Sequence, residues 1–143
     1  MDLTVGARFG SGEYMMTREE VLDFARRYDP QPFHLDDAAA AAHPFFDRLP
    51  ASGWHTCAVV MRLTVDRWEA DGVRPLGGLG IDEIRWLRPV YPGDTIHCEY
   101  EVLGVTRGKP RPEMALVRVA TRTINQDGVV AMSMVSNVIF PAG

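Results

Sequence analysis

Cysteine is scarce in this chain of 143 residues, in which Cys57 and Cys98 are the two examples. Neither belongs to a CxxC pair or to a cluster of cysteine and histidine. The sequence therefore has no pattern typical of a zinc site and no disulfide framework. Isolated cysteines of this kind are typical of small core residues in a reducing compartment, so we expect the protein to reside in the cytoplasm.

Excess positive charge and long apolar runs are also lacking. The 15 lysines and arginines are outnumbered by 19 acidic residues, which gives a formal net charge of −4. An acidic balance without a long basic run argues against a nucleic-acid surface. No apolar run approaches the roughly 20 residues that span a bilayer, and the first residues show no signal-peptide pattern. We therefore expect neither nucleic acid nor a membrane as a partner.

The longest helical pattern runs from Ser52 to Ala70 and contains no proline, and no glycine after Gly53. Ser52 can cap the first free N–H groups, and apolar side chains then cover more than half of the circumference. Such a helix needs apolar cover on most sides. With 46% hydrophobic residues, the chain can bury one core. We therefore expect residues 1–143 to form a single α+β domain in which an antiparallel sheet wraps around this central helix.

Extended segments supply that sheet. Four of them alternate in part between apolar and polar residues and are separated by glycine-containing turns, at residues 79–89, 94–106, 113–125 and 129–140. The last is apolar enough to be sheltered on both faces, by the helix or by another subunit. A weaker segment at residues 5–16 contains three glycines, which indicates a bent or edge strand rather than a central one.

A short polar turn carries the candidate chemistry. Thr17 and Glu20 form a capping box that begins a helix, and Pro30 and Pro32 end it near Asp29. The two prolines stiffen the backbone between Asp29 and His34, so a carboxylate and an imidazole can face one cavity for acid–base work. The alternative is that Asp29 only caps the helix and that His34 is a polar residue of the turn. We expect the nearby Asp36 to cap a further short helix over residues 37–42.

The stretches FARRYDPQPFHLD (24–36) and ASGWHT (51–56) resemble the MaoC-like dehydratase family, which includes (R)-specific enoyl-CoA hydratases and adopts the hot-dog fold. The resemblance continues through LRPVYPGDTI (87–96) and the closing strands. Asp29, Pro32 and His34 match the aspartate, proline and histidine of the family motif. Gln31 stands where the hydratases usually have asparagine.

The resemblance implies reversible hydration of an acyl-CoA-type enoyl thioester without any metal or redox cofactor. Asp29 and His34 would activate water and deliver a proton to the α-carbon. The N–H of Gly53 would bind the thioester carbonyl, with Gln31, Ser52 and Phe33 also against the substrate. The family's habit of joining two sheets edge to edge implies a homodimer.

Several alternatives stay open. A hot-dog thioesterase would use acids of the central helix, but Asp66 and Glu69 lie too far along it from Gly53. A subunit that binds acyl thioesters without catalysis would keep the fold and lose the reaction.

Three further features also have two interpretations or a structural one. Phe45 and Phe46 would line an acyl tunnel with Phe33, or serve ordinary packing. The basic loop 107–111 would meet the phosphates of coenzyme A, or be merely solvated. His55 is interpreted as structural.

Overall fold

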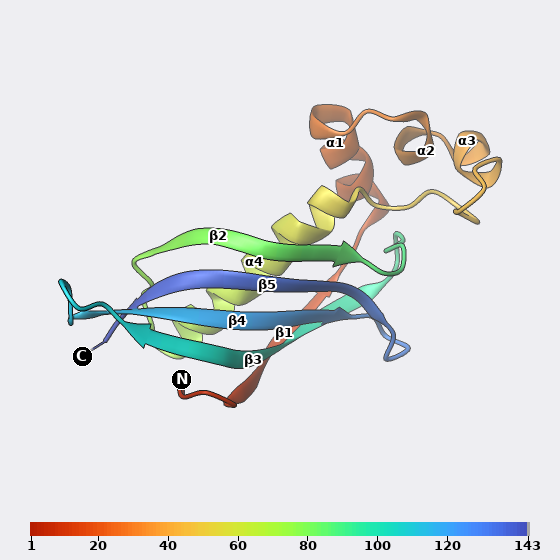
Figure 1. Cartoon of the computed structure of the whole chain (residues 1–143). Coiled ribbons are helices and arrows are strands. Elements are labelled where there is room, and N and C mark those ends of the chain that lie inside the picture. Colours follow the sequence, from red (N-terminus) through yellow and green to blue (C-terminus); the bar gives the residue numbers. More distant parts are fainter. Residues whose placement is uncertain (143) are drawn as a thin grey trace.

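The computed structural model describes residues 1–142. In chain order the elements are β1 (Arg8–Met15), α1 (Arg18–Tyr28), α2 (Pro32–Leu35), α3 (Asp37–Ala41), α4 (Gly53–Ala70), β2 (Gly77–Trp86), β3 (Thr95–Arg107), β4 (Met114–Ile124) and β5 (Val130–Pro141). The strands form one antiparallel sheet in the order β1-β3-β4-β5-β2. Helix α4 crosses behind this sheet, and α1–α3 form a lobe beyond its N-terminal end (Figure 1). The α+β architecture built on one long helix is therefore confirmed.

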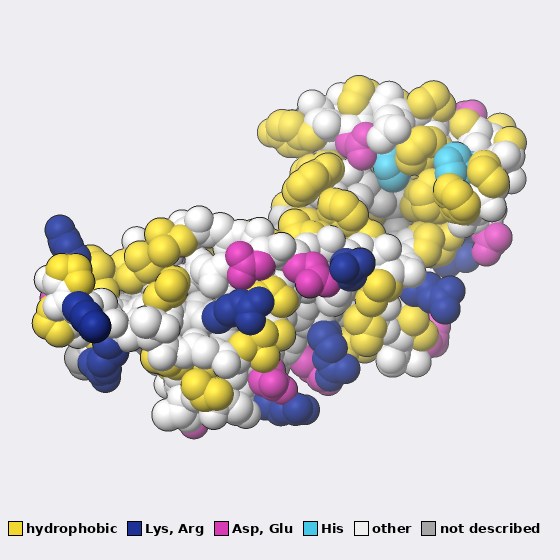
Figure 2. Space-filling model, viewed as in Figure 1, with side chains coloured by type: hydrophobic (Ala, Val, Ile, Leu, Met, Phe, Trp, Pro, Cys, Tyr) yellow, Lys and Arg dark blue, Asp and Glu magenta, His cyan; other side chains and the backbone are white. Residues whose placement is uncertain are grey.

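The core lies between α4 and the inner face of the sheet. On β3, Ile96, Cys98, Tyr100 and Val102 are all buried, as the alternation of that strand predicts. The facing positions of β4 include Val117, and the helix contributes side chains such as Val59, Val60 and Leu63. Basic and acidic side chains are scattered over the outer face (Figure 2). Arg122 and Glu99 form an ion pair between the neighbouring strands β4 and β3, and the pair Arg118–Asp82 reaches from β4 past β5 to β2.

Helix α4 is covered on one side only. The helix contacts β1 and β3 and, near its start, α1, whereas Trp54 and Met61 are 58% and 48% exposed. The apolar cover that this helix needs on most sides is therefore only partly supplied within one chain, because the half of the sheet formed by β5 and β2 does not close over it. Within residues 1–142, no helix is both long and apolar enough to cross a membrane.

Strand β2 forms a free edge of the sheet. It pairs with β5 alone, and every one of its residues except Ile84 is exposed. Leu79 is 64% exposed and Ile81 49%. Strand β5 lies between β4 and β2, as a central strand should, but most of its side chains are only half-buried. The expected shelter on both of its faces is thus incomplete within one chain.

Candidate active site

The chain segment that follows α1 positions the two candidate acid–base residues. Thr17 caps α1 by accepting a hydrogen bond from the N–H of Glu20, as predicted, and the N–H of Asp29 ends the helix on the carbonyl of Ala25. The prolines do more than end α1. Pro32 begins the short helix α2, a position where its missing N–H costs nothing, and α2 carries His34. Asp36 then caps α3 through its side chain, as expected.

Asp29 and His34 are brought together. Their side chains are 15% and 7% exposed, and His34 Nε2 lies 3.3 Å from Asp29 Oδ2. The other ring nitrogen, Nδ1, lies 2.9 Å from the carbonyl oxygen of Pro50. Because a carbonyl only accepts hydrogen bonds, Nδ1 must carry the proton. In neutral His34, Nε2 therefore carries a lone pair that points toward the carboxylate. Nε2 and Asp29 Oδ2 are then two hydrogen-bond acceptors that face the same small volume.

Two donors hold the carboxylate of Asp29. The Ser52 hydroxyl donates to Oδ2 at 2.7 Å, and the Gln31 side-chain amide donates to Oδ1 at 2.6 Å. Burial by itself would raise the pKa of Asp29. The hydrogen bonds from Ser52 and Gln31, together with the nearby imidazole of His34, outweigh burial and hold this pKa below its usual value. Asp29 is therefore an ionised acceptor at neutral pH.

Gly53 begins α4 beside this pair. Ser52 is the N-cap and accepts a hydrogen bond from the N–H of Trp54 at 3.3 Å, while no acceptor within residues 1–142 pairs with the N–H of Gly53. A free N–H at a helix start favours an oxygen that gains negative charge. A Cβ at this position would lie 2.5 Å from atoms of the Trp86 indole, so no larger residue fits unless that ring moves.

A cavity of about 560 Å³ joins these groups. Of the residues predicted from sequence, Asp29, His34, Gly53, Phe45 and Phe46 line it.

Gln31, Ser52 and Phe33 are not part of the wall of this cavity. Gln31 and Ser52 instead hold the Asp29 carboxylate. Phe33 packs against His34, His43 and Phe46, with ring centroids 4.5, 4.8 and 5.4 Å apart. All three residues therefore lie behind the wall of this cavity, and their contact with the substrate stays a prediction. Figure 2 shows histidine side chains among hydrophobic ones on this lobe.

The opposite wall of the cavity was missed by sequence reasoning. It consists of Trp54 and of residues at and after the end of β2, which include Trp86 and Arg88. The Trp86 indole N–H donates to the carbonyl of Gly53 at 3.0 Å. Arg88 is exposed and has no carboxylate within 4.0 Å among the described residues. No local pattern indicates these positions, since pairing of β2 with β5 brings them to the helix.

The basic loop 107–111 lies at the other end of the sheet (Figure 1). It follows β3 next to Pro141, the last residue of β5, whereas Ala131 near the start of β5 lines the cavity. Ten residues of strand at about 3.3 Å each place the two ends on the order of 33 Å apart. Within one chain this loop does not reach the site.

His55 stays structural. It is buried, and its ring stacks on Phe24 at 4.9 Å, where α4 meets α1. Burial lowers the pKa of His55. It does not line the cavity that contains Asp29.

Replacing Ser52 tests its hold on Asp29. We expect Ser52→Ala to raise the pKa of Asp29, because a donor to the charged form is lost. Activity that needs the carboxylate should then begin to fall at a higher pH during acidification, and stability should fall by about 1–3 kcal/mol from the lost cap and hydrogen bond. Thr17→Ala is the matched control, since it removes a helix cap without touching Asp29. The acid limb of the pH–activity profile could instead move equally in both variants, or in neither. Either result would contradict the claim that the hydrogen bond from Ser52 lowers the pKa of Asp29.

Comparison with known proteins places the chain in a family. A MaoC-like dehydratase of known structure from Rhodospirillum rubrum is 40% identical, with a TM-score of 0.85 over 97% of this chain and 93% of that one. The (R)-hydratase of A. caviae is 27% identical, with a TM-score of 0.73 over 97% and 98%. The 3-hydroxyacyl-thioester dehydratase Z of Mycobacterium tuberculosis is 31% identical over 70% of this chain and 67% of its own length. The MaoC-like domain model matches residues 4–126, and the chain belongs to this family.

Proposed function

We propose that this protein adds water reversibly to the double bond of an enoyl thioester, with Asp29 and His34 as the acid–base pair. The observation that carries the proposal is the convergence of Asp29 Oδ2 and the lone pair of His34 Nε2, 3.3 Å apart, in the wall of a cavity that also exposes Gly53. A water molecule donating to both acceptors keeps its own lone pairs free to attack carbon. The names of the relatives, a hydratase and a dehydratase of acyl thioesters, support the same reaction class.

The steps balance without an external reactant. The water oxygen forms a bond to the β-carbon and gives one proton to the Asp29–His34 pair. The electrons of the double bond move toward the thioester oxygen, where the N–H of Gly53 stabilises the charge. The pair then returns one proton to the α-carbon as the carbonyl forms again. No covalent intermediate with the protein is needed.

The thioester carrier would extend from the open side of the cavity. Arg88 lines this cavity and has no carboxylate within 4.0 Å among the described residues. A guanidinium without a carboxylate partner suits the phosphate groups of a phosphopantetheine-type carrier such as coenzyme A. Arg88 would therefore bind the phosphate groups of the carrier, which loop 107–111 is too distant to reach within one chain.

Thioester hydrolysis is less well supported. The acids of α4, Asp66 and Glu69, follow Gly53 by 13 and 16 residues. At about 1.5 Å per residue they lie on the order of 20 Å along the helix from the proposed carbonyl site. Asp66 also pairs with Arg62 on the exposed side of the helix. A subunit that binds thioesters without reaction remains the alternative to test.

A panel of enoyl-CoA esters tests the proposal. Purified protein should convert at least one ester to the 3-hydroxyacyl product without releasing free thiol, and calorimetry should report binding in parallel. Thiol release would instead indicate a thioesterase. Binding without either reaction would indicate a binding subunit. In that last case Gln31→Asn, which introduces the amide usual in the hydratases, decides whether the motif is intact but detuned.

We further propose that two copies of the chain pair through their β2 edges to form a homodimer. The argument rests on the unpaired outer side of β2 and on the apolar groups exposed there and on α4, namely Leu79, Ile81, Trp54 and Met61. Such an edge is a template for pairing, and a two-fold pairing closes it. A second copy would also cover the side of α4 that this chain leaves open.

Sedimentation tests this assembly. We expect the wild type to sediment as a dimer at roughly micromolar concentration, and Ile81→Lys to sediment as a monomer because it places charge on the proposed interface. Val105→Lys is the control, since Val105 is similarly exposed but lies on β3. A wild type that is monomeric at this concentration would rule out the homodimer.

A further inference from the structure

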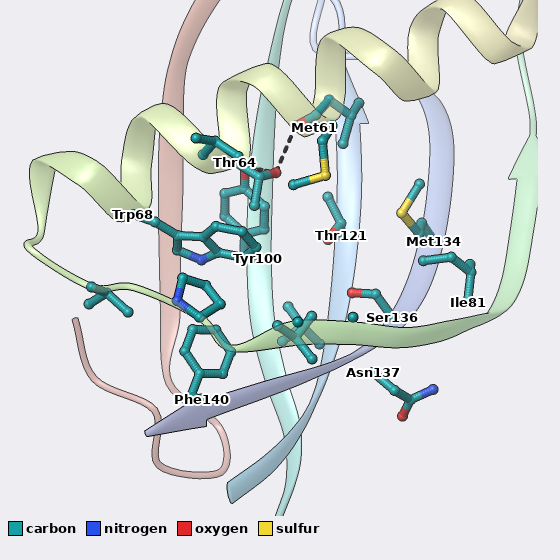
Figure 3. A pocket seen from close by; sticks show the side chains of 18 of the residues that line it. Met61, Thr64, Trp68, Ile81, Tyr100, Thr121, Met134, Ser136, Asn137 and Phe140 are labelled. Atoms are coloured by element: carbon teal, nitrogen blue, oxygen red, sulfur yellow. Dashed lines mark hydrogen bonds between the residues drawn. The ribbon is translucent and has the colours of Figure 1, made fainter. Parts of the chain in front are cut away.

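Helix α4 is held unevenly along its length. Beyond its first turns, Met61, Thr64 and Trp68 project into a cavity of about 1160 Å³ between α4 and the inner face of the sheet, so the helix is not closely packed on that side (Figure 3). The first turn of α4 instead meets α1, through His55. The placement of Gly53 relative to the residues that α1 carries therefore depends on this contact between the two helices.

The contact between α1 and α4 is small and contains a stack of two rings. The ring of His55 lies over that of Phe24, with centroids 4.9 Å apart and an angle of 7° between the planes. His55 is only 6% exposed, so its ring fills the space between the helices. A stack of flat rings fixes the distance between the helices, because the rings are rigid and each side chain has few rotamers.

That distance controls a hydrogen bond of the candidate active site. Asp29 is the C-cap of α1, five residues after Phe24, and Ser52 is the N-cap of α4, three residues before His55. The Ser52 hydroxyl donates to Asp29 Oδ2 across this junction at 2.7 Å. A movement of α1 away from α4 by about 1 Å would stretch this bond beyond the range of a good hydrogen bond.

The surroundings of the His55 ring favour its neutral form. Nδ1 is buried and has no hydrogen-bond partner among the described residues. A neutral ring with its proton on Nε2 leaves only a lone pair at Nδ1, which costs less than the unpartnered N–H of a buried imidazolium. Burial lowers the pKa of His55, although the carboxylate of Glu20 on α1 favours the charged form. Glu20 itself accepts the hydroxyl of Tyr14 on β1 at 2.6 Å.

We propose that His55 is a positioning residue whose neutral ring spaces α1 from α4. This spacing holds Asp29 against the hydroxyl of Ser52. His55 does not line the cavity that contains Asp29, so its effect on the reaction passes through that carboxylate. The expected effect on hydration rests on the proposed function, whereas the expected effect on the pKa of Asp29 does not.

Two substitutions at position 55 test the spacing. The titration of the Asp29 carboxyl carbon is followed by NMR, and kcat and KM are measured for crotonyl-CoA, in folded wild type, His55→Ala and His55→Phe. His55→Ala removes the ring, so the pKa of Asp29 should rise and kcat should fall by about 10–100-fold with little change in KM, because the acid–base group is misplaced. His55→Phe keeps a flat ring against Phe24 and should retain both wild-type values at neutral pH.

Leu63→Ala is the matched control. Leu63 is buried two turns further along α4 and lines neither cavity, so its truncation destabilises the same helix away from α1 (Figure 1). It should lower the melting temperature without moving the pKa of Asp29 or kcat per folded molecule. A wild-type pKa of Asp29 in folded His55→Ala would overturn the proposal. An equal shift in Leu63→Ala would do the same, as would a failure of His55→Phe to retain the wild-type pKa.

Stability in acid tests the neutral ring. Because the pKa of His55 is lowered in the folded protein, the unfolded chain takes up this proton first as the pH falls. The stability that neutral His55 contributes is complete above the ordinary histidine pKa of about 6.5 and is lost as the pH falls through the lowered value. His55→Phe takes up no such proton. Below about pH 6.5 the wild type should therefore lose more of its free energy of unfolding than this variant, and equal losses would overturn the proposal of a neutral ring.

The two measurements on His55→Ala separate this inference from the proposed reaction. If the wild type hydrates no enoyl ester but the pKa of Asp29 rises in His55→Ala and not in Leu63→Ala, the positioning role stands and the hydratase assignment fails. If hydration occurs and neither the pKa of Asp29 nor kcat changes in folded His55→Ala, the positioning role fails and the hydratase assignment stands.

Discussion

Asp29→Asn and His34→Ala are each expected to lower kcat/KM for enoyl thioester hydration by about 10²–10⁴-fold, the range typical of a positioned acid–base group. The reason is the shared point between Asp29 Oδ2 and His34 Nε2, where one water molecule would contact both residues. The double variant should lose little more than either single variant, because effects within one catalytic unit are far from additive.

Stability measurements separate this result from a structural role. Asp29 also accepts the Ser52 hydroxyl, and His34 also meets the carbonyl of Pro50, so both variants lose supporting hydrogen bonds. Circular dichroism and melting curves give the folded fraction of each variant. If the two residues only support the turn, the variants should be less stable but fully active per folded molecule. That outcome, or losses that multiply in the double variant, would contradict a shared catalytic unit.

Removal of the Gly53 N–H is expected to lower the hydration rate by about 10²–10³-fold, as is typical for one donor to a developing oxyanion. Substitution by a larger residue is a poor test, since any Cβ meets the Trp86 ring and disturbs packing. Glycolic acid at position 53 exchanges the N–H for an ester oxygen and leaves the side chain unchanged. Rates with the enoyl ester preferred by the wild type provide the measurement.

Glycolic acid at position 72 is the matched control. The N–H of Gly72 donates to the carbonyl of Glu69 at the end of α4, outside the cavity that contains Asp29 and His34. Its loss should lower the melting temperature with little effect on kcat. If the position 53 variant is folded and as fast as the wild type, Gly53 does not bind the carbonyl.

Local signals made much of the fold predictable. Thr17 with Glu20 marks the start of α1, and Pro30 marks its end, because capping and proline geometry act within a few residues. Ser52 marks the start of α4 in the same way. Helix α2 was missed because two prolines in three residues indicate a turn, although Pro32 is well suited to a first helical position.

Long-range packing explains what sequence reasoning missed in the site. Asp29 and His34 could be chosen as candidates, and their proximity predicted, because they share one stiff turn. Ser52 is 23 residues from Asp29, and its role as a donor to that carboxylate depends on where α4 docks. Trp86 reaches Gly53 across 33 residues, through the pairing of β2 with β5. No periodicity in the sequence encodes such contacts.

The destination of the oxygen atom tests the central claim most directly. Wild-type protein would be incubated with crotonyl-CoA in water enriched in heavy oxygen, and the products would be analysed by mass spectrometry. Water addition predicts one labelled oxygen on the β-carbon of an intact 3-hydroxyacyl thioester, with no label in free acid. Label in a released carboxylate would contradict the claim in favour of thioester hydrolysis, and unlabelled, unchanged ester in the presence of measured binding would contradict catalysis altogether.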